Sequence, residues 1–309
     1  MRLHILSIIL FALSLGLFSD SFSQQTSPQE EIILRTVHDE NAGTISIFRN
    51  DEDEPILIQN AQPEIRPYIH PITAPDGNGI LTQLRPDHHT HQTGLYWGLK
   101  RVNERDYFMA CCKPGQTGYY RRVSANVLVP NDKQVKWQTV YDLLNEEGQT
   151  ILTEIQTWSL KQKNDEFILD LEWQGQAKMD VTVGEYFVGG LFLRMPWYER
   201  IDGEAVNASG QKNNEAEAQR SIWLDTGMEI EGRDDWGHIA IFDHPNNTDF
   251  PISWRVDGEL GVGPSRQITG DWTLQPEEVE TVRYRLIIYT GELDAWEMNQ
   301  RWLDFITIY

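Results

Sequence analysis

The feature that most constrains this chain is a series of short runs after residue 30 that alternate apolar and polar residues or are rich in β-branched and aromatic residues. Polar turn sequences separate the runs, as at residues 50–53, 75–79 and 145–148. Closely spaced strands of this kind favour a sandwich or barrel over βαβ units. The clearest runs are TISIFRN (44–50), ILTEIQTWSL (151–160), EFILDLEWQG (166–175), GLFLRMP (190–196), HIAIFD (238–243) and VRYRLIIYTG (282–291).

One segment near the C-terminus has the pattern of a helix. In LDAWEMNQRWLDFI (293–306), Leu293, Trp296, Met298 and Trp302 would share a broad apolar face. No repeat and no second composition regime divides the rest of the chain. The sequence therefore predicts an all-β fold, a large antiparallel β-sandwich over residues 24–309 as a single domain, with one C-terminal helix that covers a sheet.

Residues 1–23 have the pattern of a cleavable signal peptide. A short polar start precedes an apolar run at residues 5–18, which is too short to span a bilayer. Small residues at positions 21 and 23 predict cleavage before Gln24, and hence a periplasmic or secreted protein. The two cysteines, Cys111 and Cys112, are adjacent and so are poorly placed to bridge each other. The fold must therefore rest on its hydrophobic core.

The acidic balance of the chain limits its partners. The sequence has 26 Lys and Arg against 47 Asp and Glu, a net charge of −21. A surface of this charge repels nucleic acid and anionic membranes, so neither is expected as a partner. It also repels anionic substrates unless a site is locally basic. Residues 64–106 are close to charge-balanced, with five Arg and Lys against five Asp and Glu and four histidines, which is a local rise in potential for this chain.

Three histidines lie close together in RPDHHTHQTGLYWG (85–98). On a strand, His89 and His91 would point the same way, a spacing that suits metal ligands. A metal also needs a third ligand, and His244 in FDHPNN (242–247) is the best candidate, with His70 as another. Three interpretations stay open here: a divalent metal at His89, His91 and His244, a metal-free acid–base or substrate site, and structural hydrogen bonding.

Two further segments carry candidate residues. RPYIHP (66–71) holds Arg66, Tyr68 and His70 between prolines that stiffen the backbone, which suits either a preorganised site or a protected edge strand. In GGLFLRMPW (189–197), Arg194 lies within an apolar strand, and a buried arginine needs a carboxylate from the protein or from a substrate. Trp97 follows the histidines, where its ring would stack on a sugar.

The order of these segments resembles the PmoA-like family, whose label was borrowed from a methane oxygenase subunit. RPYIHP, PDGNG, DHHTHQTGLYWG, GGLFLRM and HIAIFDHPNN follow one another over roughly residues 60–290. The resemblance implies a β-sandwich related to the mutarotase-like supersandwiches of carbohydrate enzymes, and a secreted protein associated with sugar breakdown. The histidine motif departs from the family's D-H-x-H-H-x-G-L, because His88 and Gln92 replace its first Asp and its third His.

Together these features predict a secreted carbohydrate-active enzyme of polysaccharide degradation. We expect a carbon–oxygen lyase, either a polysaccharide lyase or a dehydratase, that acts by β-elimination on uronic-acid-containing oligosaccharides. Such chemistry needs a cation for the sugar carboxylate, a base for the C5 proton and an acid for the departing oxygen. Arg66 and Arg194 are predicted to bind the carboxylate, and His89 or His91 to be the base. The acid is predicted among Tyr68, His70 and His244.

Two alternatives to elimination stay open. One is a sugar epimerase, mutarotase or glycoside hydrolase on the same scaffold, although no facing pair of carboxylates for hydrolysis is evident in the sequence. The other is a glycan-binding protein without catalysis. Convergence of the three histidine segments with an arginine would favour catalysis.

Overall fold

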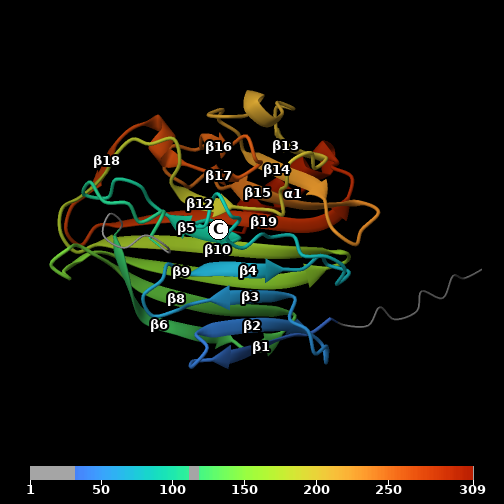
Figure 1. The fold of residues 1–309 in the computed structure, drawn as a ribbon, viewed down its shortest axis with the longest axis horizontal. Coiled ribbons are helices and arrows are strands. Elements are labelled where there is room, and N and C mark those ends of the chain that lie inside the picture. The colour runs from blue at the N-terminus through green and yellow to red at the C-terminus, as the bar shows by residue number, and fades with distance from the viewer. Residues whose placement is uncertain (1–31, 111–117, 309) are drawn as a thin grey trace, which may run out of the picture. The chain divides into compact units, whose positions relative to one another are not determined.

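Two antiparallel sheets account for most of the computed structural model, which describes residues 32–110 and 118–308 (Figure 1). The nine-stranded sheet contains, in spatial order, β16 (Trp254–Val256), β17 (Val262–Pro264), β12 (Gly190–Leu193), β5 (Leu95–Gly98), β4 (Tyr68–Ile72), β3 (Leu57–Asn60), β2 (Thr44–Arg49), β1 (Leu34–Asp39) and β7 (Asn131–Asp132). The eight-stranded sheet contains β13 (Gly203–Asn207), β14 (Trp223–Glu229), β15 (Trp236–Asp243), β19 (Val279–Gly291), β10 (Glu166–Ala177), β9 (Thr150–Lys163), β8 (Gln134–Leu144) and β6 (Tyr119–Val129). The remaining elements are a strand pair, β11 (Val181–Val183) with β18 (Trp272–Leu274), the 3-10 turns η1 (Asn213–Glu215) and η2 (Arg266–Thr269), and the helix α1 (Ala295–Ile306).

All six runs singled out in the sequence are strands, namely β2, β9, β10, β12, β15 and β19. Burial follows the period-two pattern, since every second residue of β9 from Leu152 to Leu160 is buried. The prediction of a large antiparallel β-sandwich with a C-terminal helix is therefore confirmed. The signal peptide and the pair Cys111–Cys112 lie outside the described residues, so those two interpretations stay predictions.

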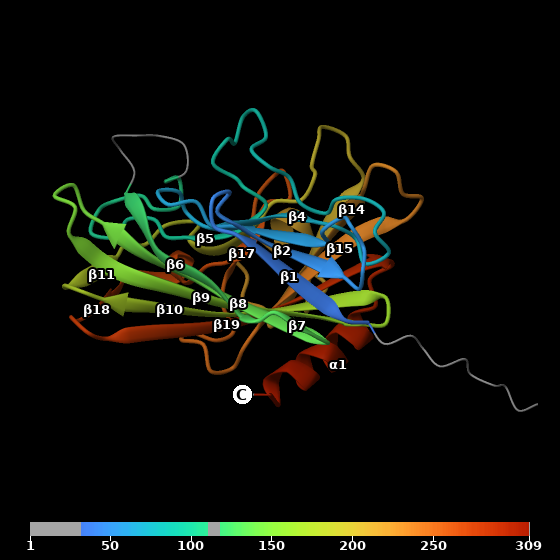
Figure 2. The same ribbon diagram turned by 90° about the horizontal axis from the view of Figure 1, so that it is seen from below.

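The two sheets face each other across one hydrophobic core, and Figure 2 shows them as two layers. Leu95 and Trp97 of β5 enter this core from the nine-stranded sheet, and Leu169 and Trp173 of β10 enter it from the eight-stranded sheet. Since side chains alternate along a strand, the residues between them point to the outer faces. The outer face of each sheet is thus available for other contacts.

Helix α1 covers part of the outer face of the eight-stranded sheet. The side chain of Asp294 caps the helix by accepting hydrogen bonds from the backbone of Trp296 and Glu297. Met298 and Phe305 pack against this sheet face, as the amphipathic pattern predicts. Trp296 was expected on the same face but is 69% exposed, because it lies two residues before Met298, about 200° around the helix, and so faces away from the sheet. No helix in the described parts of the chain has the length and apolar character needed to cross a bilayer.

Candidate functional site

The candidate site lies on the outer face of the nine-stranded sheet, where β4, β5 and β12 are neighbours. The register of the three strands places Tyr68 opposite Tyr96, and Tyr96 opposite Phe192. Their sequence neighbours in β5 point into the core, so these three aromatic side chains form a row on the outer face. The strand that follows the histidines, β5, therefore lies between RPYIHP and GGLFLRM, which are more than a hundred residues apart in the sequence.

A second row on this face combines His70, Gly94 and Arg194. The backbone N–H of Arg194 donates to the carbonyl of Gly94 at 2.8 Å. Gly94 has a φ of +78°, and a Cβ there would lie 2.6 Å from the carbonyl oxygen of Ile69 and 3.1 Å from the Cβ of His70. Only glycine lets the chain turn this close to β4. The glycine of HQTGLYWG thus sets the path of the preceding histidine loop.

The histidines lie on a tight loop, residues 84–93, and not on a strand. A bridge between Leu84 and Thr93 closes the loop, and the N–H of Arg85 donates to the carbonyl of Gln92 at 2.7 Å. Within the loop, the N–H of His89 donates to Pro86, which makes a turn. The expectation that His89 and His91 share the face of a strand is therefore wrong. Pro86 and the turn chemistry around it override the alternation.

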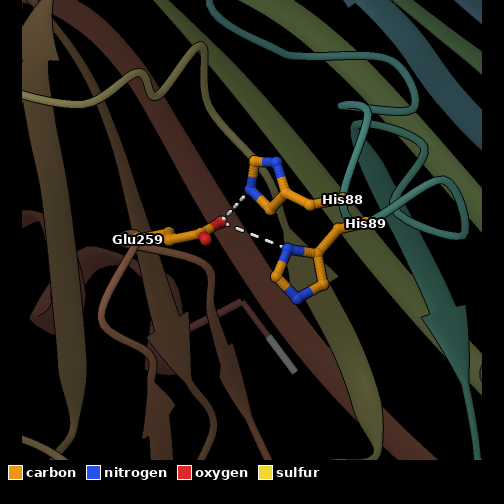
Figure 3. A group of neighbouring side chains, drawn as sticks. All are labelled: His88, His89 and Glu259. Carbon is orange, nitrogen blue, oxygen red and sulfur yellow. Dashed lines mark hydrogen bonds and ion pairs between the residues drawn. The ribbon is translucent and has the colours of Figure 1, made fainter.

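Two of these histidines converge on Glu259, a residue that the sequence did not suggest (Figure 3). The Nε2 atom of His88 lies 2.8 Å from one carboxylate oxygen of Glu259, and the Nδ1 atom of His89 lies 3.2 Å from the same oxygen. The guanidinium of Arg194 is 2.9 Å from that oxygen as well. Glu259 is thus the carboxylate that the buried arginine requires.

A short turn holds Glu259 in position. Its backbone N–H and that of Gly261 both donate to one side-chain oxygen of Asp257, at 2.9 and 2.8 Å. The turn closes where the N–H of Asp257 donates to the carbonyl of Gly261. Asp–Gly sequences favour such turns, so DGELG (257–261) is the local signal that could have identified this loop.

Glu259 contacts both imidazoles, but only His88 is hydrogen-bonded to it. Partial burial acts to raise the pKa of Glu259, but the hydrogen bonds from His88 and Arg194 outweigh it and lower the pKa below its ordinary value. The ionised carboxylate accepts a hydrogen bond from His88, whereas His89 Nδ1 lies 3.2 Å from the same oxygen without a hydrogen-bond partner. The Nε2 atom of His89 points away from Glu259 (Figure 3). His89 therefore presents one ring nitrogen to the carboxylate and the other away from it.

The two arginines predicted to bind a substrate carboxylate are both buried. Arg194 is 0% exposed and also donates from Nε to Gln83 at 3.1 Å. Arg66 is 1% exposed, and its guanidinium stacks 3.5 Å from the ring centroid of Tyr96. Burial lowers the pKa of Arg66. The predicted direct contact of these arginines with substrate is therefore wrong for this structure, because protein atoms cover both guanidinium groups.

Arg66 instead supports the histidine loop from beneath. It donates from one terminal nitrogen to the carbonyl of His91 at 2.8 Å and to Thr93 Oγ1 at 3.1 Å. Its other terminal nitrogen donates to the carbonyl of Phe108. The rings of His89 and His91 lie 5.7 Å apart, and His91 approaches Phe108 at 5.9 Å. Arg66 is thus a positioning residue for the loop.

Arg85 is a cation that the sequence interpretation passed over. It lies in the histidine loop with an exposed side chain and a φ of +52°. No carboxylate of the described residues lies within ion-pair distance of its guanidinium. Burial raises the pKa of Tyr68, while the charges of Arg85 and Arg66 act in the opposite direction, so Arg85 lies within electrostatic reach of Tyr68. An exposed cation without an ion-pair partner can bind an anionic group.

His70 lies on the same face but is more enclosed. Its Nδ1 atom is 2.9 Å from Thr82 Oγ1, and burial lowers its pKa to about 4. His70 is therefore neutral at neutral pH. Half-buried Tyr68, another residue predicted as the acid, has a raised pKa and so keeps its phenolic proton at neutral pH.

Two predicted site residues lie elsewhere. Trp97 points into the sandwich and stacks on Trp173, with ring centroids 4.3 Å apart. His244 follows β15 of the other sheet, and its ring packs edge-on against Phe305 of α1 at 5.0 Å. Burial lowers its pKa, with further lowering from Arg283 and Arg285. The sugar-stacking role of Trp97 and the metal group of His89, His91 and His244 are therefore wrong.

A different group of side chains has the composition of a metal site. Ligand atoms of His88, His89 and Glu259 all lie within 4.8 Å of one another, and two imidazoles with a carboxylate suit a divalent transition metal. The guanidinium of Arg194, however, already neutralises the shared oxygen of Glu259. A cation on that oxygen would meet this charge at short range, so the donor set fits a metal only through the other carboxylate oxygen.

A family model described as a family of unknown function, DUF6807, matches residues 58–303. No curated protein matches the chain. Two GH36 alpha-galactosidases from Geobacillus stearothermophilus have similar solved structures. AgaB is 7% identical over 83% of this chain and 41% of its own, with a TM-score of 0.44. AgaA is 7% identical over 84% and 40%, with a TM-score of 0.41.

A polysaccharide lyase is also similar, with 8% identity over 88% of this chain and 34% of its own and a TM-score of 0.32. The chain therefore spans less than half the length of these three structures. At such identities and TM-scores the similarity does not extend to activity. The resemblance to the PmoA-like family is not tested by any of these matches and stays a prediction.

Proposed function

We propose that this chain, which belongs to DUF6807, a family of unknown function, is a carbohydrate-active enzyme. The proposed reaction is β-elimination on a uronic acid residue of an oligosaccharide. It expels either a sugar, as a polysaccharide lyase does, or water, as a dehydratase does.

One observation carries the proposal. The partly exposed imidazole of His89 lies 3.2 Å from the ionised carboxylate of Glu259, and the exposed guanidinium of Arg85 lies on the same loop without an ion-pair partner among the described residues. In a chain of net charge −21, an uncompensated cation on the same loop as an imidazole is suited to an anionic substrate. Elimination from a uronate requires this combination, because the carboxylate charge must be neutralised before the adjacent C–H becomes acidic.

The proposed reaction assigns one step to each group. Arg85 pairs with the sugar carboxylate, and the Nε2 atom of His89 removes the proton from C5. The electrons of the C5–H bond form the C4–C5 double bond, and the C4–O bond breaks. Tyr68 donates its phenolic proton to the departing oxygen, in keeping with a raised pKa that keeps this phenol protonated. His89 later returns a proton to Tyr68 through solvent, which restores both groups.

The direct test is a reaction screen. The mature protein is incubated with uronate-containing oligosaccharides, and absorbance in the ultraviolet band of the unsaturated uronate is followed together with product mass. We expect absorbance to rise with either chain scission or the loss of one water. A screen in which no uronate reacts would contradict the proposal and favour neutral-sugar chemistry or glycan binding alone.

Replacement of Arg85 by glutamine is expected to raise KM for a uronate oligosaccharide about tenfold or more, because a charge-assisted pair with the substrate carboxylate is lost. Stability is expected to change little, since the side chain is exposed. KM measured on the acid and on its methyl ester tests the pairing. Wild-type protein should prefer the acid, and Arg85→Gln should not. An unchanged preference would assign carboxylate binding to another cation.

Treatment with a chelator is expected to leave elimination unchanged, because Arg194 already supplies the positive charge at Glu259. The measurement compares initial rates before and after dialysis against EDTA. If activity were lost and then restored by zinc or manganese, His88, His89 and Glu259 would be metal ligands instead.

A further inference from the structure

An exposed pair of stacked aromatic rings lies beside the candidate site. The rings of Tyr186 and Phe187 are 4.3 Å apart with an interplanar angle of 30°, and Phe187 is 53% exposed. Tyr186 packs against the outer-face aromatic cluster that contains Tyr68 and Tyr96. The pair therefore extends the same face of the nine-stranded sheet towards solvent.

Three cations surround these two rings. The Lys100 ammonium and the Arg101 guanidinium each lie 5.2 Å from the ring centroid of Tyr186, and the Arg255 guanidinium lies 5.0 Å from that of Phe187. Lys100 is neutralised by Asp106 at 2.6 Å, and Arg255 is neutralised by Glu217.

Arg101 differs from the other two cations. It donates to the carbonyl of Glu185, and no carboxylate of the described residues lies within ion-pair distance of it. Its side chain is exposed. A positive charge is thus left over beside an exposed aromatic face, on a protein that is otherwise strongly acidic.

A buried glutamine makes this surface rigid. Gln267 is 0% exposed and donates from Nε2 to the carbonyls of Lys100 and Gly184, at 2.8 and 2.6 Å. Its side-chain oxygen accepts from the N–H of Lys100, and its backbone carbonyl accepts from the N–H of Tyr186. The segments that carry Lys100 and Arg101 and the two rings are therefore tied together before any ligand binds. A preorganised surface loses little conformational entropy on binding.

The rings and cations also connect to the histidine loop. The ammonium of Lys100 lies 5.5 Å from the ring centroid of Phe108, and Phe108 in turn contacts His91. An oligosaccharide with one sugar at the histidine loop would place a neighbouring sugar along this row.

We propose that Tyr186, Phe187 and Arg101 form a second subsite, which binds a neighbouring anionic sugar of the same oligosaccharide. The ring of Phe187 stacks on the apolar face of the sugar, and Arg101 pairs with its acidic group. This subsite rests on the proposed function in that the reacting uronate lies at the histidine loop. It goes further by specifying a substrate with acidic groups on at least two sugars.

Binding to polysaccharides tests the subsite without requiring catalysis. The full chain is titrated into polygalacturonate, alginate and hyaluronan, with dextran as the neutral comparison, and affinity is measured by calorimetry at low and high salt. We expect binding to at least one polyuronate and not to dextran. Phe187→Ala should weaken it about two- to tenfold. Arg101→Gln should also weaken it and should reduce its salt dependence.

Tyr198→Ala is the matched control, because Tyr198 is an exposed aromatic residue (57%) outside this row. It should bind like the wild type. Binding by Phe187→Ala equal to that of the wild type, or wild-type binding to none of the three polyuronates, would overturn the subsite. Binding through Phe187 without any elimination product would refute the proposed reaction and leave the subsite standing. Elimination by Phe187→Ala with a wild-type KM for a tetrasaccharide would support the proposed reaction and refute the subsite.

Discussion

Replacement of His89 by glutamine is expected to lower the rate of elimination by about 10²- to 10⁴-fold, the usual contribution of a general base. The expectation follows from the position of His89, whose Nδ1 atom lies 3.2 Å from Glu259 and whose Nε2 atom points away from it. Glutamine is similar in size and polar, but it has no basic nitrogen. The imidazole is 36% exposed on a surface loop, so the substitution should leave the fold intact.

His88→Gln is the control for this experiment, because His88 lies on the same loop and contacts the same carboxylate oxygen. Its ring is 50% exposed and faces Trp197, so we expect only a small loss of rate. The measurement is kcat on the best uronate substrate, with circular dichroism to verify the fold. Equal losses in the two variants would mean that the Glu259 contacts hold the loop together and that neither imidazole is the base. Undiminished turnover in His89→Gln would remove His89 from the mechanism.

A second large effect, on the pH dependence of stability, is expected from Glu154, whose carboxyl group lies in the core of the sandwich. It is 1% exposed and accepts hydrogen bonds from Trp173 Nε1 at 3.0 Å and from Gln156 Nε2 at 2.8 Å. Burial raises its pKa from 4.5 to about 7, although these hydrogen bonds and the charge of Arg66 act in the opposite direction. The folded protein therefore holds this proton more tightly than the unfolded chain does.

The contribution of Glu154 to stability consequently decreases as pH rises. Below about pH 4.5 the group is protonated in both states and imposes no penalty. Between about pH 4.5 and 7 the unfolded chain ionises first, which lowers the free energy of unfolding, and above about pH 7 the penalty is constant. A pKa difference of this size corresponds to about 3 kcal/mol. Glu154→Gln is expected to remove this part of the pH dependence.

The measurement is urea unfolding of the wild type and of Glu154→Gln at several pH values from about 4 to 8. Their difference in unfolding free energy should change with pH by about 3 kcal/mol in favour of the variant at the alkaline end. Glu147→Gln removes the same charge at an exposed turn and should run parallel to the wild type. A Glu154→Gln profile that also stays parallel would mean that Glu154 ionises in the core with an ordinary pKa.

The sheet architecture follows from local patterns in the chain. Alternation of apolar and polar residues has the period of a strand, which is why six runs and the C-terminal helix could be predicted without any knowledge of their partners. The same local chemistry indicated that Arg194 must meet a carboxylate, since a buried guanidinium is costly without one. It also singled out the segments around residues 66–70 and 88–91, which the structure brings to one face.

The identity of that carboxylate depended on tertiary structure alone. Glu259 lies 171 positions from His88, in a turn whose sequence predicts only its own bend. The two loops meet because β4, β5, β12 and β17 pair in one register, and no local pattern encodes which strands become neighbours. Trp97 shows a related limit: Tyr96 and Trp97 are both aromatic and both buried, so alternation could not show which one enters the core.

The position of His244 depends on the whole fold and not on its local sequence. Its sequence, at the end of a strand and beside an aspartate, is as suitable for a site as that of the loop histidines. It follows β15 of the eight-stranded sheet, however, and packs against the helix on the far side of the sandwich. The sequence by itself determined that there would be strands, a core and a charge-balanced, histidine-rich segment. The pairing of strands over long separations decided which polar groups share a face, because a site is made of contacts in space and local periodicity carries information only about immediate neighbours.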